Sequence, residues 1–192
     1  DIRVGGDIVI AGQTSLSNTL GVTLYSGSVV YGRNVSIYGV GTSSSAMQLG
    51  WGSAVNFDMR ATTATGKIFI AGRSDTNQGI LLIGSSLTAP SVELLGVTPS
   101  NQVGISLGSA GWDVYKTNIY TNNLKLTADI IELGKSPVQV ATCNNQCAAA
   151  AGSSFGLDVS SYSASSDPTF NYFGGSSSVM PATGAITTGT NS

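Results

Sequence analysis

The chain has 192 residues, enough for one large β-domain or two small ones with a buried core. Only 9% of the residues are charged, against roughly 25% in soluble domains, and the formal net charge is −2. This balance excludes the basic surface that nucleic acid or an anionic membrane requires, and the lack of histidine excludes Ser-His-Asp and Cys-His catalysis. No run approaches the ~20 apolar residues of a membrane span.

Short β-strand segments follow one another through the first two thirds of the chain. They are rich in Val, Ile, Leu and Tyr and end on Gly or Asn, which is typical of strands joined by tight turns. In NVSIYG, for example, Val35 and Ile37 share one face and Ser36 and Tyr38 the other. In chain order the predicted strands are DIVIAG (7–12), VTLYSG (22–27), SVVYG (28–32), NVSIYG (34–39), KIFIAG (67–72), SVELLG (91–96), LKL (124–126) and DIIELG (129–134).

Three pairs of similar phrases indicate internal repeats. GDIVIAG begins at Gly6 and GKIFIAG at Gly66, an offset of 60 residues, and NVSIYG matches SVELLG. A shorter echo joins 87–96 to 126–134. We therefore predict a β-repeat region over 1–140 with copies near 6–54 and 66–112 and a partial third echo at 123–134. The predicted fold is all-β, either a β-solenoid or an interleaved fibre-type structure with an extended C-terminal tail, and the repeated glycines are expected at its corners.

The C-terminal segment, 141–192, has a different composition. It is rich in Ser, Gly and Thr, carries almost no charge and is punctuated by aromatic residues. We expect neighbouring subunits to order this segment. Its two cysteines, Cys143 and Cys147, lack the further Cys or His ligands of a structural zinc site. Two hypotheses stay open for them, a small disulfide-closed loop or two buried thiols.

Acidic residues offer two candidate chemistries. Asp75, Glu93, Asp129 and Glu132 are candidates for the carboxylate pair of a glycosidase, and the loops 56–58 and 74–79 are candidates for calcium. Turn capping and solvated strand faces explain these acids better. We therefore predict no catalytic residue, no cofactor and no metal site, and do not expect an enzyme.

Two tryptophans follow glycine-rich turns at corresponding places in the two copies. If exposed, Trp51 and Trp112 would stack on sugar rings, which is a carbohydrate-binding interpretation. Matching positions in a repeat are more often core anchors, and we favour that interpretation.

The stretch 107–134 resembles a phrase common in bacteriophage tail fibres. The matching residues carry an LGS motif, an aromatic loop residue and an N-I-Y segment; the family usually has Arg before the tryptophan, where this chain has Gly111. The resemblance implies a trimeric, elongated, β-structured fibre or virion appendage without an active site. The residues that carry it are Leu107, Gly108, Ser109, Trp112, Asn118, Ile119 and Tyr120.

The sequence therefore predicts a structural subunit of a phage or virus fibre or appendage that serves architecture or host adhesion. Its expected partners are copies of itself, other virion or surface-assembly proteins and a host-surface glycan, and its expected location is the virion or the cell surface. Two alternatives stay open. One is a secreted prokaryotic filament or fimbrial subunit that assembles by β-strand exchange. The other is a carbohydrate-binding β-solenoid.

Overall fold

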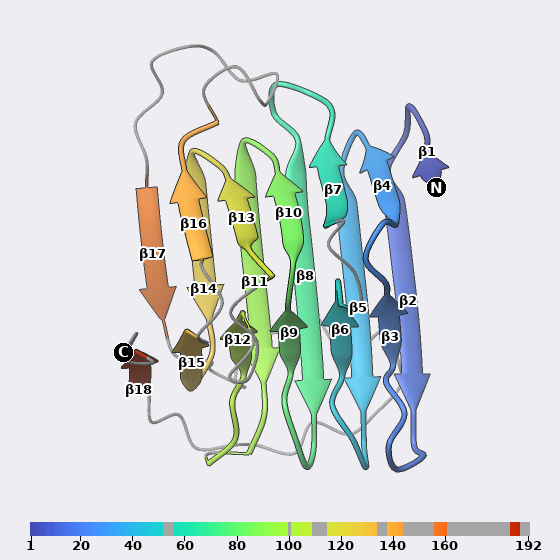
Figure 1. The fold of residues 1–192 in the computed structure, drawn as a ribbon, viewed down its shortest axis with the longest axis vertical. Helices are drawn as coiled ribbons and strands as arrows, with labels where there is room; N and C mark the ends of the chain where they lie inside the picture. The colour runs from blue at the N-terminus through green and yellow to red at the C-terminus, as the bar shows by residue number, and fades with distance from the viewer. Residues whose placement is uncertain are drawn as a thin grey trace.

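The backbone winds through three parallel sheets in turn and so forms a β-solenoid (Figure 1). The computed structural model describes residues 1–51, 56–99, 101–108, 115–133, 138–143, 156–160 and 185–188. Within these residues each sheet has six strands, and strands that neighbour each other in a sheet are three elements apart in the chain. One coil therefore contributes one strand to each sheet. The solenoid alternative of the predicted all-β fold is confirmed.

The three sheets differ in the length of their strands. Sheet A contains β1 (Ile2–Arg3), β4 (Val29–Gly32), β7 (Phe57–Ala61), β10 (Ser85–Thr88), β13 (Thr117–Tyr120) and β16 (Val138–Ala141). Sheet B contains the longest strands, β2 (Ile8–Thr14), β5 (Val35–Gly41), β8 (Lys67–Ser74), β11 (Ser91–Val97), β14 (Asn123–Thr127) and β17 (Gly156–Ser160). Sheet C contains β3 (Val22–Leu24), β6 (Met47–Leu49), β9 (Ile80–Leu82), β12 (Ile105–Leu107), β15 (Ile130–Leu133) and β18 (Ala185–Thr188).

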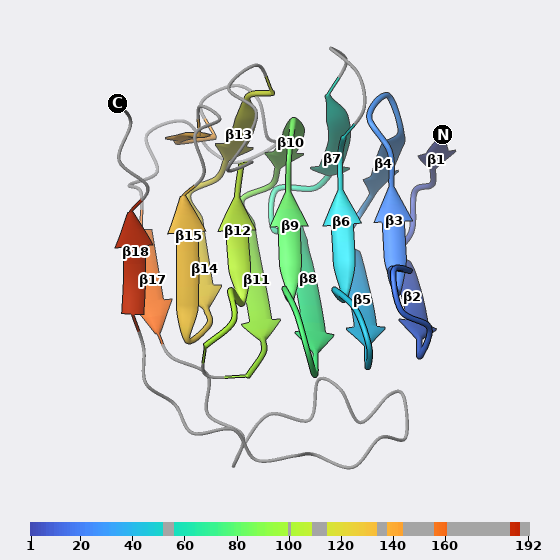
Figure 2. The ribbon, with the colours of Figure 1, turned by 60° about the horizontal axis from the view of Figure 1, so that its bottom comes forward.

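The sheets are arranged in two layers. Sheet B forms one layer, and sheets C and A lie end to end in the other, with their strands running opposite to those of sheet B (Figure 1). Figure 2 shows sheet C beside sheet B, with the first coil at one end of the stack and the last at the other. Neighbouring parallel strands are about 4.8 Å apart, so residues at paired positions form lines along the solenoid axis. Among the described residues no helix is long and apolar enough to cross a membrane.

The core lies between the layers and consists of such lines, one aliphatic residue from each coil. Strand alternation selects them: Val35 and Ile37 are fully buried, whereas Ser36 and Tyr38 lie on the outer face of sheet B, as predicted. Sheet A faces these lines with Phe57, Met59 and Leu87, all fully buried. One sheet B line runs through Ile8, Val35, Ile68, Val92 and Leu124, and a second through Ile10, Ile37, Ile70, Leu94 and Leu126.

Some of the repeated glycines lie inside strands rather than at corners. A Cβ on Gly72 would lie 2.4 Å from the carbonyl oxygen of Gly79, and a Cβ on Gly96 would lie 2.1 Å from that of Gly104. Here the segment leading into sheet C touches the backbone of sheet B and leaves no room for a side chain. The prediction of corner glycines is therefore wrong for the paired line Gly12, Gly39, Gly72 and Gly96.

Other glycines do occupy a corner, the one between sheet C and sheet A. There the chain turns from one sheet into the next through residues with φ between 57° and 91°. This left-handed region favours glycine because a side chain clashes with the backbone. The glycines concerned are Gly27, Gly50, Gly84 and Gly108.

The sequence repeats correspond to pairs of coils. Ile8 pairs with Val35 and Val35 with Ile68, so a step of 27 residues and one of 33 give the offset of 60. The echo between 87–96 and 126–134 does not mark equivalent positions, because Leu87 lies in sheet A and Leu126 in sheet B.

Candidate functional site

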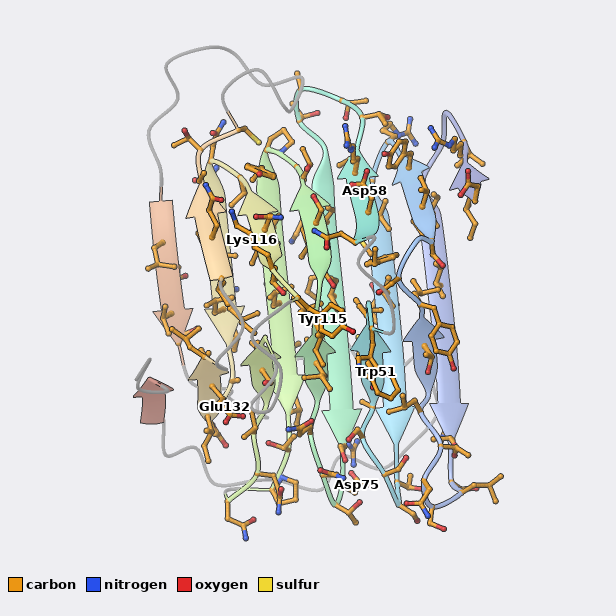
Figure 3. All side chains as sticks on the ribbon, in the orientation of Figure 1. Trp51, Asp58, Asp75, Tyr115, Lys116 and Glu132 are labelled. Atoms are coloured by element: carbon orange, nitrogen blue, oxygen red, sulfur yellow. The ribbon has the colours of Figure 1, made fainter. Side chains whose placement is uncertain are left out.

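The candidate carboxylates lie on separate parts of the solenoid. Asp75 follows β8 and forms an ion pair with Arg73 (3.1 Å), whereas Glu132 lies in β15 (Figure 3). Asp129 is buried between β14 and β15, and Glu93 lies on the outer face of sheet B. The described parts of the chain contain no group of three or more His, Cys, Asp or Glu side chains that could hold a metal ion.

Glu93 joins three coils on the outer face of sheet B. Its two carboxylate oxygens accept hydrogen bonds from Lys67 of the coil before and Lys125 of the coil after, the second at 3.1 Å. Burial alone would raise the pKa of Glu93, but the two lysines outweigh it and hold that pKa below its usual value. A carboxylate held between two cations is unsuited to act as a general acid, and here it links three neighbouring coils through two ion pairs.

Asp58, in the candidate calcium loop 56–58, belongs to an ion-pair cluster on the outer face of sheet A. It accepts hydrogen bonds from the guanidinium of Arg60 (2.9 Å) and from the phenol of Tyr31. Arg60 and Arg3 stack on the Tyr31 ring, with centroid distances of 5.2 and 4.5 Å. Burial, followed by the bond to Asp58, raises the pKa of Tyr31. These contacts occupy Asp58 and connect the first three coils.

Cys143 lies two residues after β16, the last strand of sheet A, and is buried. It is disulfide-bonded, and its sulfur lies 3.1 Å from the carbonyl oxygen of Ala89. Cys147 lies outside the described residues, so the pairing of Cys143 with Cys147 stays a prediction. Cys143 is therefore not a free buried thiol, as the second of the two hypotheses for the cysteines required.

Trp51 lies at the corner between sheets C and A, and the expectation that it is a core anchor is wrong. Trp51 is 45% exposed, and both Gly50 and Trp51 have positive φ there (76° and 149°). Trp112 lies outside the described residues. Sugar stacking by either tryptophan stays a prediction.

Two tyrosines that the sequence analysis did not single out lie at the same corner. Tyr25 directly follows β3 and is 62% exposed. Tyr115 lies against the corner of the third coil, because a Cβ on Gly84 would be 3.3 Å from the Cβ of Tyr115. Figure 3 shows Trp51 and Tyr115 on the same side of the molecule, at the level where sheet C ends and sheet A begins. We call Tyr25, Trp51 and Tyr115 the corner row.

Both ends of the described solenoid expose residues that continue the core lines. In sheet A the line through Val30 ends at Ile2 (42% exposed) and, at the other end, at Val140 (40% exposed). In sheet B the lines end at Leu157 and Val159, which are 59% and 38% exposed. The end strands therefore present apolar side chains together with unpaired strand edges.

No protein-family model, curated protein or solved structure matches this chain. The resemblance to tail fibres therefore rests on its motif alone. Leu107 ends β12, Gly108 turns the corner with φ of 91°, and 118–120 lie in β13, while Ser109 and Trp112 are outside the described residues.

Proposed function

We propose that this protein is a structural subunit of a fibre or appendage on a virus particle or phage, built from copies of itself, and that it is not an enzyme. Its task is architecture or adhesion at a host surface. The observation that carries the proposal is the exposure of core-line residues at both ends of the solenoid.

These ends are complementary in geometry. β17 closes one end of sheet B and β2 the other, and both belong to the same stack of parallel strands. A second copy placed head to tail would add its β2 to β17 and continue both core lines, with Ile8 next to Leu157 and Ile10 next to Val159. A head-to-tail contact does not close on itself and therefore generates a fibre.

The composition supports a surface that packs against copies of itself. Only 9% of the residues are charged, so mutual repulsion between copies is weak. The described ion pairs are mostly satisfied within one chain, as at Glu93 and Asp58. Assembly through the ends then buries apolar groups without stranding charges.

The first experiment is sedimentation over a range of protein concentrations, with electrophoresis in unheated SDS. A discrete SDS-resistant trimer supports a virion-type fibre. Polymers that grow with concentration support assembly through the ends, as a fibre on a virus particle or, in the alternative setting, as a filament on a prokaryotic surface. A monomer at every concentration contradicts both.

The Val9→Pro variant tests the contact itself. The N–H of Ile8 donates to Asn34, so in a parallel strand the N–H of the next residue, Val9, points to the open edge of β2. Proline removes that donor and is tolerated on an edge strand. We expect Val9→Pro to stay monomeric where the unaltered protein polymerises, whereas Val9→Thr, which keeps the donor, should polymerise. Equal polymerisation of both variants would exclude contact through β2.

A further inference from the structure

We infer that the corner row binds a neutral polysaccharide, by stacking of Tyr25, Trp51 and Tyr115 on the faces of successive sugar rings. The inference concerns a ligand surface on each chain and does not depend on self-assembly. It starts from three aromatic residues near one corner. Tyr25 follows the first coil's sheet C strand and Trp51 the second's, and Tyr115, which follows β12, lies against the corner of the third coil.

The three positions are neighbours along the solenoid axis. Leu24 pairs with Leu49, so the residues that follow them, Tyr25 and Gly50, occupy adjacent coils. The N–H of Trp51 donates to Ser26 Oγ (2.9 Å), and the N–H of Ser26 donates to the carbonyl of Trp51 (3.3 Å).

Tyr115 extends the row to the third coil. Tyr115 lies against the corner of Gly84, and the carbonyl of the next residue, Lys116, accepts a hydrogen bond from the side-chain amide of Asn56 (3.3 Å). Tyr25 and Trp51 therefore lie on adjacent coils, whose backbones are about 4.8 Å apart, and Tyr115 lies against the corner of the next coil. A ligand that fits such a row is itself linear and repeating.

The backbone at Trp51 holds its side chain in an unusual position. A bulky residue with φ of 149° is an outlier, and such strain is found where the surrounding structure imposes it, often at ligand-binding positions. Here the hydrogen bonds to Ser26 and the preceding Gly50 impose it. The backbone that carries the indole is therefore fixed before any ligand arrives, which lowers the entropy cost of binding.

The chemistry around the row suits an uncharged, hydroxyl-rich ligand. Ser26 and Asn56 have polar side chains at this corner, where they bond the backbone of Trp51 and Lys116, and Ser28 follows in the same connection; Lys116 is the charged residue next to Tyr115 in the described chain. Aromatic faces stack on the apolar faces of sugar rings while the polar neighbours bond their hydroxyls.

The size of the row favours a small or narrow ligand over a protein partner. An aromatic side chain buries about 150–250 Å² at most, and all three are partly covered already. Their combined area is therefore below the roughly 800 Å² per partner of a stable protein interface. A polysaccharide strand needs no such area.

The test is native electrophoresis in gels that contain dextran, mannan, soluble starch or hydroxyethyl cellulose, with alginate as an anionic comparison. We expect at least one neutral polymer, and not alginate, to retard the protein. Tyr25→Ala and Trp51→Ala should each raise the dissociation constant for that polymer, obtained from mobility against polymer concentration, at least tenfold. Leu16→Ala, which removes another exposed apolar side chain (67%), should leave it unchanged.

Two further measurements separate binding from folding and from the other tryptophan. Far-ultraviolet circular dichroism and thermal melting should show that Tyr25→Ala and Trp51→Ala stay folded. In a Trp112→Phe background, tryptophan emission comes from Trp51 alone and should shift on titration with the retarding polymer. No retardation by any of the neutral polymers overturns the inference, as does unchanged retardation of folded Trp51→Ala. These expectations for polysaccharide binding are the same whether sedimentation shows a monomer, a trimer or a polymer.

Discussion

Gly72 occupies a position where no other residue fits. A Cβ there would lie 2.4 Å from the carbonyl oxygen of Gly79, and the atom in the way is backbone that cannot rotate aside. We expect Gly72→Ala to lower the free energy of unfolding by about 3 kcal/mol, the upper part of the usual range for overpacking. The measurement is denaturant unfolding followed by circular dichroism.

Gly6→Ala provides the matched control. Nothing lies within 4 Å of the position that its Cβ would take, so the change should stay within about 0.5 kcal/mol. Equal effects of the two substitutions would mean that the contact between sheet B and the entry to sheet C is looser than described.

Asp7 gives the first coil a dependence on pH. Its carboxylate accepts hydrogen bonds from Arg33 (2.8 and 2.9 Å) and then from Asn34 (2.9 Å), which lower its pKa to about 2 from 3.8. Because the folded pKa is the lower one, the contribution to stability is fully present above pH 3.8 and is lost as pH falls through about 2. An NMR titration should show a pKa near 2 for Asp7.

Arg33→Ala should return the pKa of Asp7 toward 3.8 and remove this acid-dependent part of the stability. Arg3→Ala is the control, since Arg3 pairs with Asp1 and not with Asp7 (3.7 Å to Asp1). A pKa of Asp7 that does not respond to Arg33→Ala would contradict the assigned cause.

Strands of the same sheet contribute unequally, depending on the coil to which they belong. Ile70 of β8 is fully buried between neighbours on both sides, whereas Ile10 of β2, in the same line, is half-buried with a neighbour on one side only. We expect Ile70→Ala to cost about 3 kcal/mol and Ile10→Ala about 1 kcal/mol in denaturant unfolding. Equal costs would contradict an open end at β2.

The length of a strand determines whether it can be predicted from the sequence. The long strands of sheet B alternate over several residues, so segments such as NVSIYG and KIFIAG are recognisable as strands. The strands of sheet C have three or four residues, too few for a period, and β6 and β12 were not predicted. The corner row could not be predicted either, since Tyr115 is far from Gly84 in the sequence and lies against it only in the folded chain.

The described residues form a stack in which each inner coil contacts the coils before and after it, and each end coil contacts one. The coils differ in length, with steps of 27, 33 and 24 residues between paired positions Ile8, Val35, Ile68 and Val92. This unequal spacing explains why the repeat was recognised as pairs of coils rather than as single coils. The variable residues lie in connections, while the strands keep their register.

Such a stack should be most stable in the middle and least stable at its ends. Nearest-neighbour coupling gives inner coils two stabilising contacts and end coils one. In hydrogen exchange on monomeric Val9→Pro, we expect the amides of β8 and β11 to exchange slowest and those of β2 and β17 fastest. Uniform protection would contradict this order. If copies stack through their ends, polymers of the unaltered protein should also protect the outward N–H of Ala11, which faces solvent in the monomer; rapid exchange at Ala11 in such polymers would place the contact elsewhere.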